Sequence, residues 1–575
     1  MARLGEARWV FEDIPGEKIK DLAKQLGLPY LLVVVLWKRG LRDEISIKRF
    51  LNPSEEILHD PFLLPDMESA VTRLLAARDR NEKILVHGDY DTDGISGTAL
   101  LIRGLARLGF NAGFYLPHRI RDGYGLSIKS IEEAKRINAS LILTVDCGVT
   151  AIEESRILKE EGFELVITDH HVPLESLPEA AAVVDPKRKD SRYPFQELSG
   201  VGVAYKLLAA LSSQVKNCDY DVNDDLDLVA LGTIADVVPL KEENRFFAKF
   251  GLERLSESDK PGVSSLLEIA KMKGKAATSS NVAFGIAPRL NASGRMADGL
   301  MALRLLLTDE ETEAKKLVTE LDKHNNLRKQ TEDAMLEDAR VLTESIMAEP
   351  STKVIICKSP EWHEGILGIV AARLVDEFYR PVILFTEKDG VLKGSARSIP
   401  GFHIFEALYS ARDTISNFGG HEAAAGLVLQ QTRFKAFNES INAYASSIPE
   451  EVFIQKLNLD AEIELSDIDD EIRNGINKLS PFGIGNPEPC FMTRGLEIVG
   501  NPRVFGKNHL AFTVRKSGAT FPVMAFRKAD LILTLEPGKK GALDIAYEIA
   551  EDNYWGKNTV KLIAKDIHLN IHSEE

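Results

Sequence analysis

The chain has 575 residues, which is too long for one ordinary hydrophobic core and predicts two to four domains. Its 44% hydrophobic and 27% charged residues are typical of a globular protein and exclude a fibrous repeat or a disordered chain. The net charge of −16 argues against nucleic acid as a partner, because phosphate binding depends on Lys and Arg, but metal-binding carboxylates or a local basic groove would be compatible with it.

No segment predicts a membrane partner or a secreted protein. The longest apolar runs, such as residues 31–37, are far too short to span a bilayer. The first residues contain early acids and lack the apolar core of a secretory signal. We therefore expect a cytoplasmic location.

After an N-terminal region (residues 1–80), short apolar runs recur, and each ends directly in a polar cluster: KILVHGDYD, LILTVDCG, ELVITDHH and AAVVDP. Such runs are typical of buried parallel strands. Helix-like segments, such as residues 98–108 and 127–136, lie between them. The alternation predicts a doubly wound α/β domain over residues 81–307, whose ligands would bind at the carboxyl ends of the strands.

Three further segments follow. Residues 308–349 contain hardly any helix breaker and are rich in Glu, Lys, Leu and Ala, so we expect a long connector helix. The strand-like KVIICK and PVILFT flank a helix-like segment (365–377) and precede the glycine-rich FGGHEAAAG, which predicts a second α/β domain over residues 350–450. Short strands with turn signals fill residues 455–575 and predict a small antiparallel β-barrel.

The segment HGDYDTDG (87–94) places one imidazole and three carboxylates directly after a buried strand. Holding Asp89, Asp91 and Asp93 close together costs roughly 3 kcal/mol per pair at about 5 Å and an effective dielectric of ~20. Cations offset that cost, and mixed carboxylate and imidazole ligands suit Mn²⁺ or Mg²⁺. The four cysteines form no CxxC pair, which argues against a zinc finger and a disulfide framework.

Further candidate ligands follow the next strands: Asp146 in VDCG, the run Asp169, His170 and His171, and later Asp236 in ADVVP. A single Asp after a strand usually caps a turn or a helix. Three clusters at successive strand ends, with a fourth behind them, instead indicate a metal site. Two cations bound close together activate water and stabilise charge in displacement at phosphorus, so the pattern predicts hydrolysis of a phosphoester or a phosphoanhydride.

In this order the clusters resemble the motifs of the DHH phosphoesterase superfamily, and FGGH (418–421) resembles its associated domain. The terminal barrel resembles the OB-fold domain of the RecJ exonucleases, so the resemblance covers nearly the whole chain. It implies a 5′-to-3′ exonuclease that acts on single-stranded DNA in recombination and repair. A single-strand-binding protein and a RecQ-type helicase would be its partners.

The resemblance also implies roles for individual residues. One Mn²⁺ or Mg²⁺ ion would be held by His87, Asp91 and Asp146, and a second ion by Asp93, Asp146, His170 and Asp236. Of the remaining motif residues, His171 would contact the scissile phosphate and His421 would approach it from the second domain. Asp89 and Asp169 would orient the ligands from behind.

Candidate phosphate-binding residues lie in glycine-containing segments. Guanidinium groups fit phosphate oxygens in pairs, and in the family such residues hold the DNA backbone and the 5′-terminal phosphate. The positions that match are Arg289, Asn291, Arg295, Ser395, Arg397, Gly419 and Gly420, with Arg119 or Arg121 facing them. For each arginine alone, a solvated surface loop stays an alternative.

The barrel also carries cationic and aromatic residues that suit a sequence-independent path for a single strand. The residues are Arg503, Lys507, Lys539, Lys540, Lys557, Lys561, Phe505, His509, Phe512, Tyr554 and Trp555. Core packing explains at least half of the aromatic residues equally well.

Two groups of alternatives stay open. The first is an inorganic pyrophosphatase, a nano-RNase or a cyclic-dinucleotide phosphodiesterase, enzymes that share the metal core but lack the N-terminal region and the barrel. The second is a non-catalytic replication scaffold, against which the intact ligand set argues.

Overall fold

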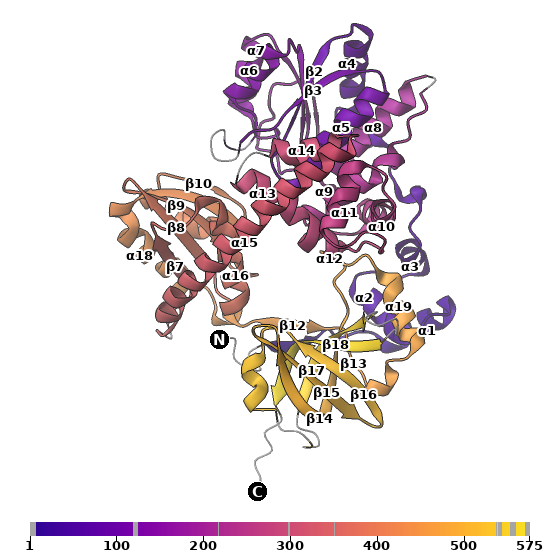
Figure 1. The fold of residues 1–575 in the computed structure, drawn as a ribbon, viewed down its shortest axis with the longest axis vertical. Coiled ribbons are helices and arrows are strands. Elements are labelled where there is room, and N and C mark those ends of the chain that lie inside the picture. Colours follow the sequence, from indigo (N-terminus) through magenta and orange to yellow (C-terminus); the bar gives the residue numbers. More distant parts are fainter. Residues whose placement is uncertain are drawn as a thin grey trace. The chain divides into compact units, whose positions relative to one another are not determined.

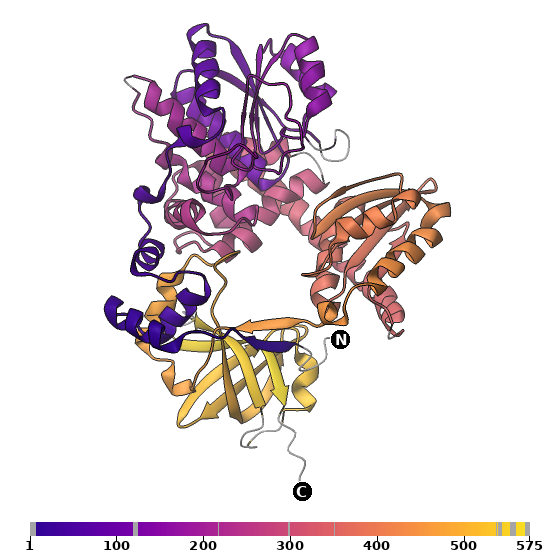
Figure 2. The ribbon, with the colours of Figure 1, turned by 180° about the vertical axis from the view of Figure 1, so that it is seen from behind.

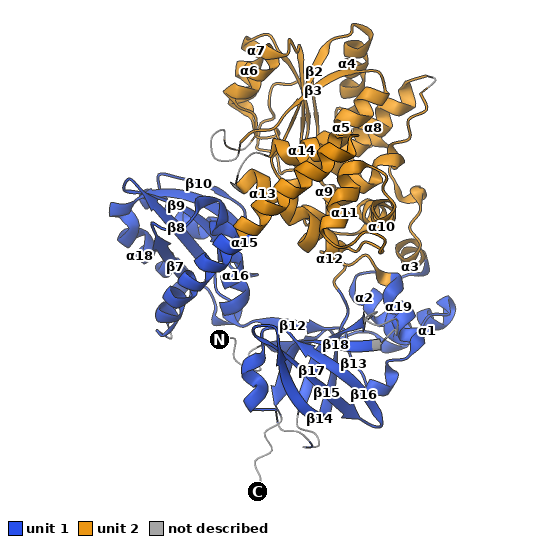
Figure 3. Cartoon of the chain, in the orientation of Figure 1, with its two compact units in different colours: residues 1–44, 329–478, 488–575 blue, residues 45–328, 479–487 orange. Residues whose placement is uncertain are grey.

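The computed structural model describes residues 7–118, 123, 125–216, 218–296, 299–349, 351–535, 538, 543–552 and 559–569. The chain forms two compact units (Figure 3). Unit 2 comprises residues 45–328 and 479–487, and unit 1 comprises residues 1–44, 329–478 and 488–575. The N-terminal region expected over residues 1–80 is therefore divided between the two units. Within the described ranges no helix combines the length and the apolar character needed to cross a membrane.

Unit 2 contains a five-stranded sheet with the strand order β3-β2-β4-β5-β6 (Figure 1). All its pairings are parallel, which confirms the predicted sheet. Its strands are β2 (Lys83–Gly88), β3 (Asn111–Tyr115), β4 (Leu141–Val145), β5 (Glu164–Thr168) and β6 (Ala182–Val184). The sequence NAGFY of β3 has no apolar run, since every residue of this edge strand is only half-buried, and for that reason the sequence did not predict it.

Alternate side chains of each strand enter two separate cores, as a doubly wound sheet requires. Val86 and Leu143 pack in the larger core with helices from one face, whereas Leu85 and Ile142 pack in a smaller core with helices from the other face. The helices of the larger core include α4 (Met67–Asp79), α5 (Thr92–Arg107) and α8 (Gly200–Gln214), and those of the smaller core are α6 (Ile128–Arg136) and α7 (Ile152–Glu160).

The helix expected over residues 98–108 begins earlier, at Thr92, because Asp91 caps it. The Asp91 carboxylate accepts hydrogen bonds from the backbone N–H groups of Asp93 (3.0 Å) and Gly94 (3.2 Å). These bonds satisfy donors that a helix start leaves unpaired. The cap turns a loop of acids into the first turn of a helix, which fixes where those acids lie.

A helical layer completes unit 2. It contains α3 (Glu44–Leu51), α9 (Leu226–Ala235), α10 (Glu242–Ser256), α11 (Pro261–Ile269), α12 (Ser279–Asn281), α13 (Ala287–Met296), α14 (Leu300–Leu307) and the first part of α15 (Glu311–Met347). Arg245 of α10 is 1% exposed, and its guanidinium donates to the carbonyl oxygens of Phe50 (2.7 Å) and Ser480 (2.9 Å). One buried cation therefore ties three distant segments of the chain together.

Unit 1 contains a mixed five-stranded sheet with the order β10-β11-β9-β8-β7. Its strands are β7 (Ile355–Ser359), β8 (Val382–Lys388), β9 (Val391–Arg397), β10 (Asn417–Gly420) and β11 (Ala424–Gln430), accompanied by α16 (Leu367–Phe378), α17 (Ile404–Ser410) and α18 (Phe434–Ser446). The predicted connector is the 37-residue helix α15, and the boundary between the units falls within it. In unit 1 this helix is tied to α16, since Arg340 donates to Glu377 at 2.7 Å.

The C-terminal part of unit 1 is a barrel with the order β13-β14-β15-β16-β18-β17, closed by pairing of β14 with β17. Its elements are β13 (Ala461–Glu462), α19 (Asp470–Leu479), β14 (Cys490–Phe505), β15 (His509–Lys516), β16 (Ala519–Ala525), β17 (Leu543–Asp552) and β18 (Thr559–Leu569). The predicted barrel is confirmed, but it is not wholly antiparallel. Strand β18 pairs with β17 on one side and with β16 on the other, and its pairing with β16 is parallel.

The start of the chain packs against this barrel. Strand β1 (Arg8–Phe11) pairs in parallel with β12 (Lys456–Leu459), and the two strands lie side by side in both views (Figures 1 and 2). The indole of Trp9 donates to Asp566 at 2.9 Å and stacks on the ring of His568. Helices α1 (Gly16–Leu26) and α2 (Tyr30–Lys38) follow, and Lys38 donates to the Leu459 carbonyl at 2.7 Å.

Candidate metal centre

The predicted clusters of unit 2 gather at the carboxyl ends of the parallel strands, as expected for this fold. His87 lies near the end of strand β2, Asp146 follows β4, and His170 follows β5. Asp93 lies in the first turn of α5, and Asp236 caps the end of α9. Side chains that are far apart in sequence thus converge on one edge of the sheet.

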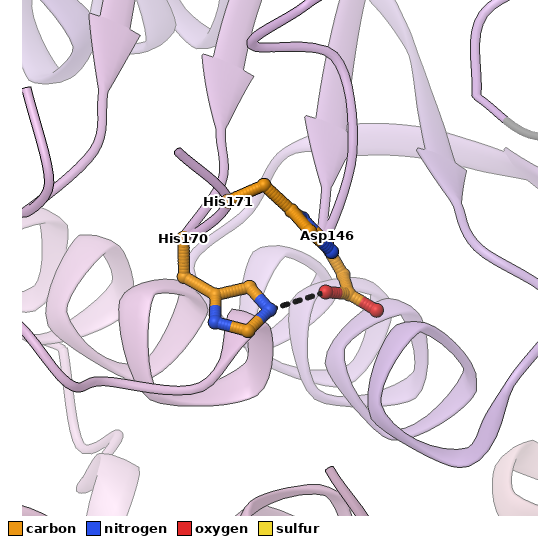
Figure 4. A group of neighbouring side chains, drawn as sticks. All are labelled: Asp146, His170 and His171. Carbon is orange, nitrogen blue, oxygen red and sulfur yellow. Dashed lines mark ion pairs between the residues drawn. The ribbon is translucent and has the colours of Figure 1, made fainter. Parts of the chain in front are cut away.

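The ring of His170 faces the carboxylate of Asp146 (Figure 4). Its Nε2 atom is 3.1 Å from Asp146 Oδ1 and 3.6 Å from Asp236 Oδ2. Two sets of potential ligand atoms lie within 4.8 Å of one another around it, namely Asp93 with His170 and Asp236, and Asp146 with His170 and His171. The geometry therefore brings together the predicted ligands of the second ion.

A third set of ligand atoms within 4.8 Å comprises Asp89, Asp91 and Asp146. Asp146 is common to this set and to one of the sets around His170, which suits a carboxylate that bridges two ions. Among the described residues His87 belongs to no such set, whereas Asp89, expected behind the ligands, does. The division of ligands at the first ion therefore stays a prediction.

The Asp93 carboxylate is held by backbone donors. Asp93 is 1% exposed, and its two oxygens accept hydrogen bonds from the N–H groups of Gly200 (2.6 Å) and Val201 (3.0 Å) at the start of α8. The positive end of a helix dipole favours a carboxylate there. A Cβ atom on Gly232 would lie 2.5 Å from Asp93 Oδ1, so only glycine leaves room for this carboxylate.

The backbone of Asp146 is strained. It has a φ of +63°, which a residue with a side chain rarely adopts, and it is 2% exposed. A Cβ atom on Gly200 would lie 2.5 Å from the Asp146 Cβ, so α8 also approaches this residue closely. Strain of this kind costs about 1–3 kcal/mol and persists where the surroundings enforce it, often at functional sites.

Cys147 supports His87, a contact that the sequence analysis missed. The thiol Sγ lies 3.8 Å from His87 Nδ1 and 3.9 Å from the His87 carbonyl oxygen, while the ring of Tyr115 packs edge-on against the imidazole. Burial raises the pKa of the Cys147 thiol, so the thiol stays protonated. A thiol that donates to the carbonyl and accepts from Nδ1–H would leave Nε2 of His87 as an electron-pair donor.

Asp169 is a structural carboxylate. Its Oδ1 atom accepts from the backbone N–H of His170 (2.7 Å) and lies 2.7 Å from His171 Nδ1, and its Oδ2 accepts from the backbone N–H of Val149 (2.9 Å). Burial acts to raise the pKa of Asp169, but the hydrogen bond from His171 and the nearby imidazoles hold it below the usual value. These contacts fit the predicted orienting role.

The two adjacent histidines differ in charge. Burial lowers the pKa of His170 to about 3 and that of His87 to about 4, so both are neutral, as metal ligands must be. Burial also acts against the charged form of His171, but the Asp169 carboxylate outweighs it and raises the pKa of His171 to about 9. His171 is therefore a cation at neutral pH, as a phosphate contact should be.

The carboxylates themselves are destabilised as anions. Burial, followed by the charges of neighbouring acids, raises the pKa values of Asp93 and Asp146 well above normal, and burial with the charge of Asp91 raises that of Asp236 to about 7. Among the described residues, the buried His87 Nε2 of this cluster has no hydrogen-bond partner, and the buried His170 Nε2 faces the oxygens of Asp146 and Asp236. Divalent cations would satisfy these atoms and offset the repulsion, and the oxygen and nitrogen donor set fits Mn²⁺ or Mg²⁺.

Helix α13 carries three of the predicted phosphate-binding residues. Asn291 Oδ1 accepts from the backbone N–H (2.8 Å) and hydroxyl (2.9 Å) of Thr92, so this residue locks the start of α5 beside Asp93. Arg289 donates to Asp322 at 2.8 Å, which holds its guanidinium in unit 2. Arg295 is half-buried in the last turn. Arg119 and Arg121 lie outside the described residues.

The remaining predicted site residues belong to unit 1. Ser395 and Arg397 lie on β9, and Arg397 donates to the Ser395 hydroxyl at 3.2 Å. A Cβ atom on Gly368 would lie 2.7 Å from the Arg397 guanidinium, which places this pair at the start of α16. Gly419 and Gly420 end β10, and exposed His421 follows them.

Comparison with known proteins agrees with this fold and this site. Three family models match: the DHH family N-terminal domain over residues 83–233, the DHHA1 domain over residues 351–447 and the RecJ OB domain over residues 459–566. With the cluster of carboxylates and histidines, they define a metal-dependent phosphoesterase of the DHH type.

Similar proteins narrow the class to one family. The single-stranded-DNA-specific exonuclease RecJ of Bacillus subtilis is 36% identical, a match that covers 97% of this chain and 70% of that protein, and RecJ of Escherichia coli is 34% identical, with coverage of 94% and 96%. The crystal structure of Thermus thermophilus RecJ in complex with Mn²⁺ superposes with a TM-score of 0.83 at 34% identity and covers 98% of this chain and 80% of that one. The chain belongs to the RecJ family.

Proposed function

We propose that the chain is a metal-dependent exonuclease that hydrolyses the phosphodiester bonds of single-stranded DNA in the 5′-to-3′ direction and acts in recombination and repair. The observation that carries the proposal is the convergence of Asp93, Asp146, His170 and Asp236 in one cluster of a RecJ-family fold. The family match over the barrel argues against the shorter phosphoesterases, which resemble only the two catalytic domains.

The cluster can hold two divalent cations, for which we propose His87, Asp91 and Asp146 on one side and Asp93, Asp146, His170 and Asp236 on the other. When bound, two such ions activate water and stabilise charge on the phosphoryl oxygens. His171, charged and 36% exposed, can donate to a non-bridging oxygen of the scissile phosphate while Asp169 fixes its ring. Asn291 keeps Asp91 and Asp93 in place through Thr92.

End recognition sets the direction of digestion in this proposal. Ser395 and Arg397, at the start of α16, present a hydroxyl and a guanidinium that suit a terminal phosphate. Gly419 and Gly420 carry no side chains, so the end of β10 beside His421 presents its backbone to the strand in this proposal. Arg289, Arg295 and Arg119 are proposed to contact the backbone of the strand.

The barrel supports a path for the strand. Phe505, His509 and Phe526 form an aromatic cluster in which neighbouring ring centroids lie 5.2 to 6.1 Å apart, and Phe526 is 49% exposed. Arg503 and Lys507 lie beside it in sequence. Aromatic rings with cations stack bases without regard to sequence. Phe512, in contrast, is 5% exposed and belongs to the core, and Lys539, Lys540, Lys557, Tyr554 and Trp555 lie outside the described residues.

Digestion of end-labelled strands tests the proposal. With Mn²⁺ or Mg²⁺, a 5′-phosphorylated single strand labelled at the 5′ end should release labelled mononucleotide at once, whereas a 3′ label should pass through progressively shorter products. Asp93→Ala and His170→Ala should abolish release and retain the fold. Asp259→Asn, at an exposed acid of the same unit, is the matched control. Undiminished activity in either ligand variant would refute the assignment.

A second experiment addresses the 5′-end pocket. Arg397→Ala should raise KM for a 5′-phosphorylated strand more than for the same strand with a 5′-hydroxyl, because only the former presents the terminal dianion. An equal effect on both substrates would remove the pocket from the proposal. Single-stranded DNA is the partner that the barrel suits; a single-strand-binding protein, a RecQ-type helicase and a cytoplasmic location complete the proposal.

A further inference from the structure

The turn after β6 carries a lysine at the metal centre. Strand β6 pairs with β5, and the backbone N–H of Asp169 donates to the carbonyl of Val184 at 3.1 Å. Residues 185–190, with the sequence DPKRKD, therefore leave the sheet beside the run that carries His170 and His171. This turn contributes no residue to the ligand sets described above.

The turn is rigidly built. Asp185 is fully buried, and its Oδ1 atom accepts from the backbone N–H of Lys187 at 2.7 Å. Arg188 is 8% exposed and donates to Asp66 (2.6 Å), to Asp190 (2.7 and 3.0 Å) and to the carbonyl of Val183 (2.6 Å). Four hydrogen bonds hold the guanidinium of Arg188 as an anchor, and the backbone of Lys187 is fixed next to it.

Lys187 differs from Arg188 in its contacts. Its side chain is half-buried, and among the described residues its ammonium takes part in no ion pair. Lys189, two positions on, is exposed. Burial of a charge costs free energy unless something compensates it, and a bound phosphate would compensate this one.

The register of the sheet places Lys187 beside the site. Thr168 of β5 pairs with Val184 of β6 in parallel, so the run Asp169–His171 and the turn 185–190 leave adjacent strands at the same edge of the sheet. Lys187 therefore follows β6 at the edge where the predicted ligands of the second ion and the phosphate contact His171 are found.

We infer that Lys187 is a substrate-binding residue of the metal centre, which donates to a non-bridging oxygen of the scissile phosphate beside His171. The inference rests on the proposed phosphodiesterase function. Displacement at phosphorus adds negative charge to those oxygens, so a fixed ammonium stabilises the transition state more than the ground state. Lys suits this task because it is a compact point charge, and the Arg188 anchor keeps its backbone in place.

Single-turnover digestion of a 5′-phosphorylated oligothymidylate with saturating enzyme and Mn²⁺ tests the inference. The variants are Lys187→Ala, Lys187→Gln and Lys187→Arg, with Lys189→Ala as the matched control. Loss of a charge-assisted hydrogen bond should slow Lys187→Ala and Lys187→Gln by about 10- to 100-fold, whereas Lys187→Arg should retain most of the rate. Lys189→Ala should match the wild type.

A merely structural lysine would behave otherwise. Mn²⁺ binding, followed by calorimetry in the absence of DNA, should not be weaker in Lys187→Ala than in the wild type. Rates for Lys187→Ala within twofold of the wild type, or an equal loss in the Arg and Ala variants together with weaker Mn²⁺ binding, would overturn the inference.

The same variants separate this inference from the proposed function. If the wild type fails to digest single-stranded DNA, the proposed function fails, and the lysine is then tested with bis(p-nitrophenyl) phosphate, which presents a phosphodiester without a DNA strand. A selective loss of that hydrolysis in Lys187→Ala and Lys187→Gln would support Lys187 alone. Equal hydrolysis by all variants would overturn the inference on its own terms.

Discussion

Replacement of Asp236 by Asn should have opposite effects on the metal-free and the metal-loaded protein. The ligand oxygens of Asp93 and Asp236 lie within 4.8 Å of each other. In the metal-free protein, burial and the charge of Asp91 raise the pKa of Asp236 to about 7, so ionisation of this carboxyl above that pH costs folding free energy. Asn keeps the shape of the side chain and removes the ionisable group, so at pH 8 Asp236→Asn should stabilise the metal-free protein by about 1–3 kcal/mol.

The same substitution removes a metal ligand. An ion at about 100 times its Kd stabilises the native state by ~2.7 kcal/mol, and Asp236→Asn should lose most of that gain at the second ion. The variant is therefore expected to be more stable than the wild type in EDTA and less stabilised by MnCl₂. Which of the two proteins is more stable therefore depends on whether the metal is present. A general packing defect would lower stability under both conditions.

Differential scanning calorimetry of the full chain measures both effects, because the transition that moves with Mn²⁺ reports on unit 2. A stabilisation of 1 kcal/mol corresponds to a rise in Tm of about 2–4 °C for a domain of 150–250 residues. The exposed acid variant Asp259→Asn should shift neither transition. A variant that is less stable than the wild type in EDTA, or that gains as much from MnCl₂, would refute the reasoning.

Three further predictions concern packing and pH. Gly232→Ala should cut the exonuclease rate at least tenfold in the labelled-strand assay, since its Cβ would lie 2.5 Å from Asp93 Oδ1; an unchanged rate would show that α9 can shift away from this carboxylate. Arg245→Met should lower the free energy of unfolding by about 2–6 kcal/mol in urea, because two carbonyl oxygens lose their donor at about 1–3 kcal/mol each; a cost below 1 kcal/mol would contradict this. Burial raises the pKa of Glu548 to about 7 despite Lys565, so the folded barrel holds a proton that the unfolded chain releases near pH 4.5. Stability should therefore fall between about pH 4.5 and 7, and Glu548→Gln should flatten that slope in urea titrations; an equal slope in both proteins would refute it.

The sequence predicts the sheet of unit 2 well because its central strands are buried on both faces. The runs KILV, LILTV and LVIT are mostly apolar, as parallel strands between two helical layers must be. Edge strand β3 has one side open and reads as NAGFY, which carries neither an apolar run nor strict alternation. Helix α5 was predicted too late because its cap and first turn carry Asp91, Asp93 and Gly94, which mask the helical pattern.

The site could be predicted as a set of residues but not as a geometry. A carboxylate after a strand reveals its chemistry, but not that Asp93 rests on the N–H groups of Gly200 and Val201, since those donors belong to a helix more than a hundred residues away. The support of His87 by Cys147 depends on the turn after β4, where Asp146 adopts a positive φ. Lys187 was missed because its motif, DPKRKD, resembles an ordinary solvated turn.

Adjacent His170 and His171 show how one strand end can supply two kinds of group. Both are neighbours of Asp169, but only His171 directs its ring Nδ1 at that carboxylate, and only its pKa rises, to about 9. His170 turns its ring into the buried cluster, where burial lowers its pKa to about 3. Titratable groups whose surroundings push their pKa values apart have separate chemical roles. The neutral imidazole can bind a cation and the charged one a phosphate. Asp169, with both oxygens occupied by donors, determines which of the two histidines is charged.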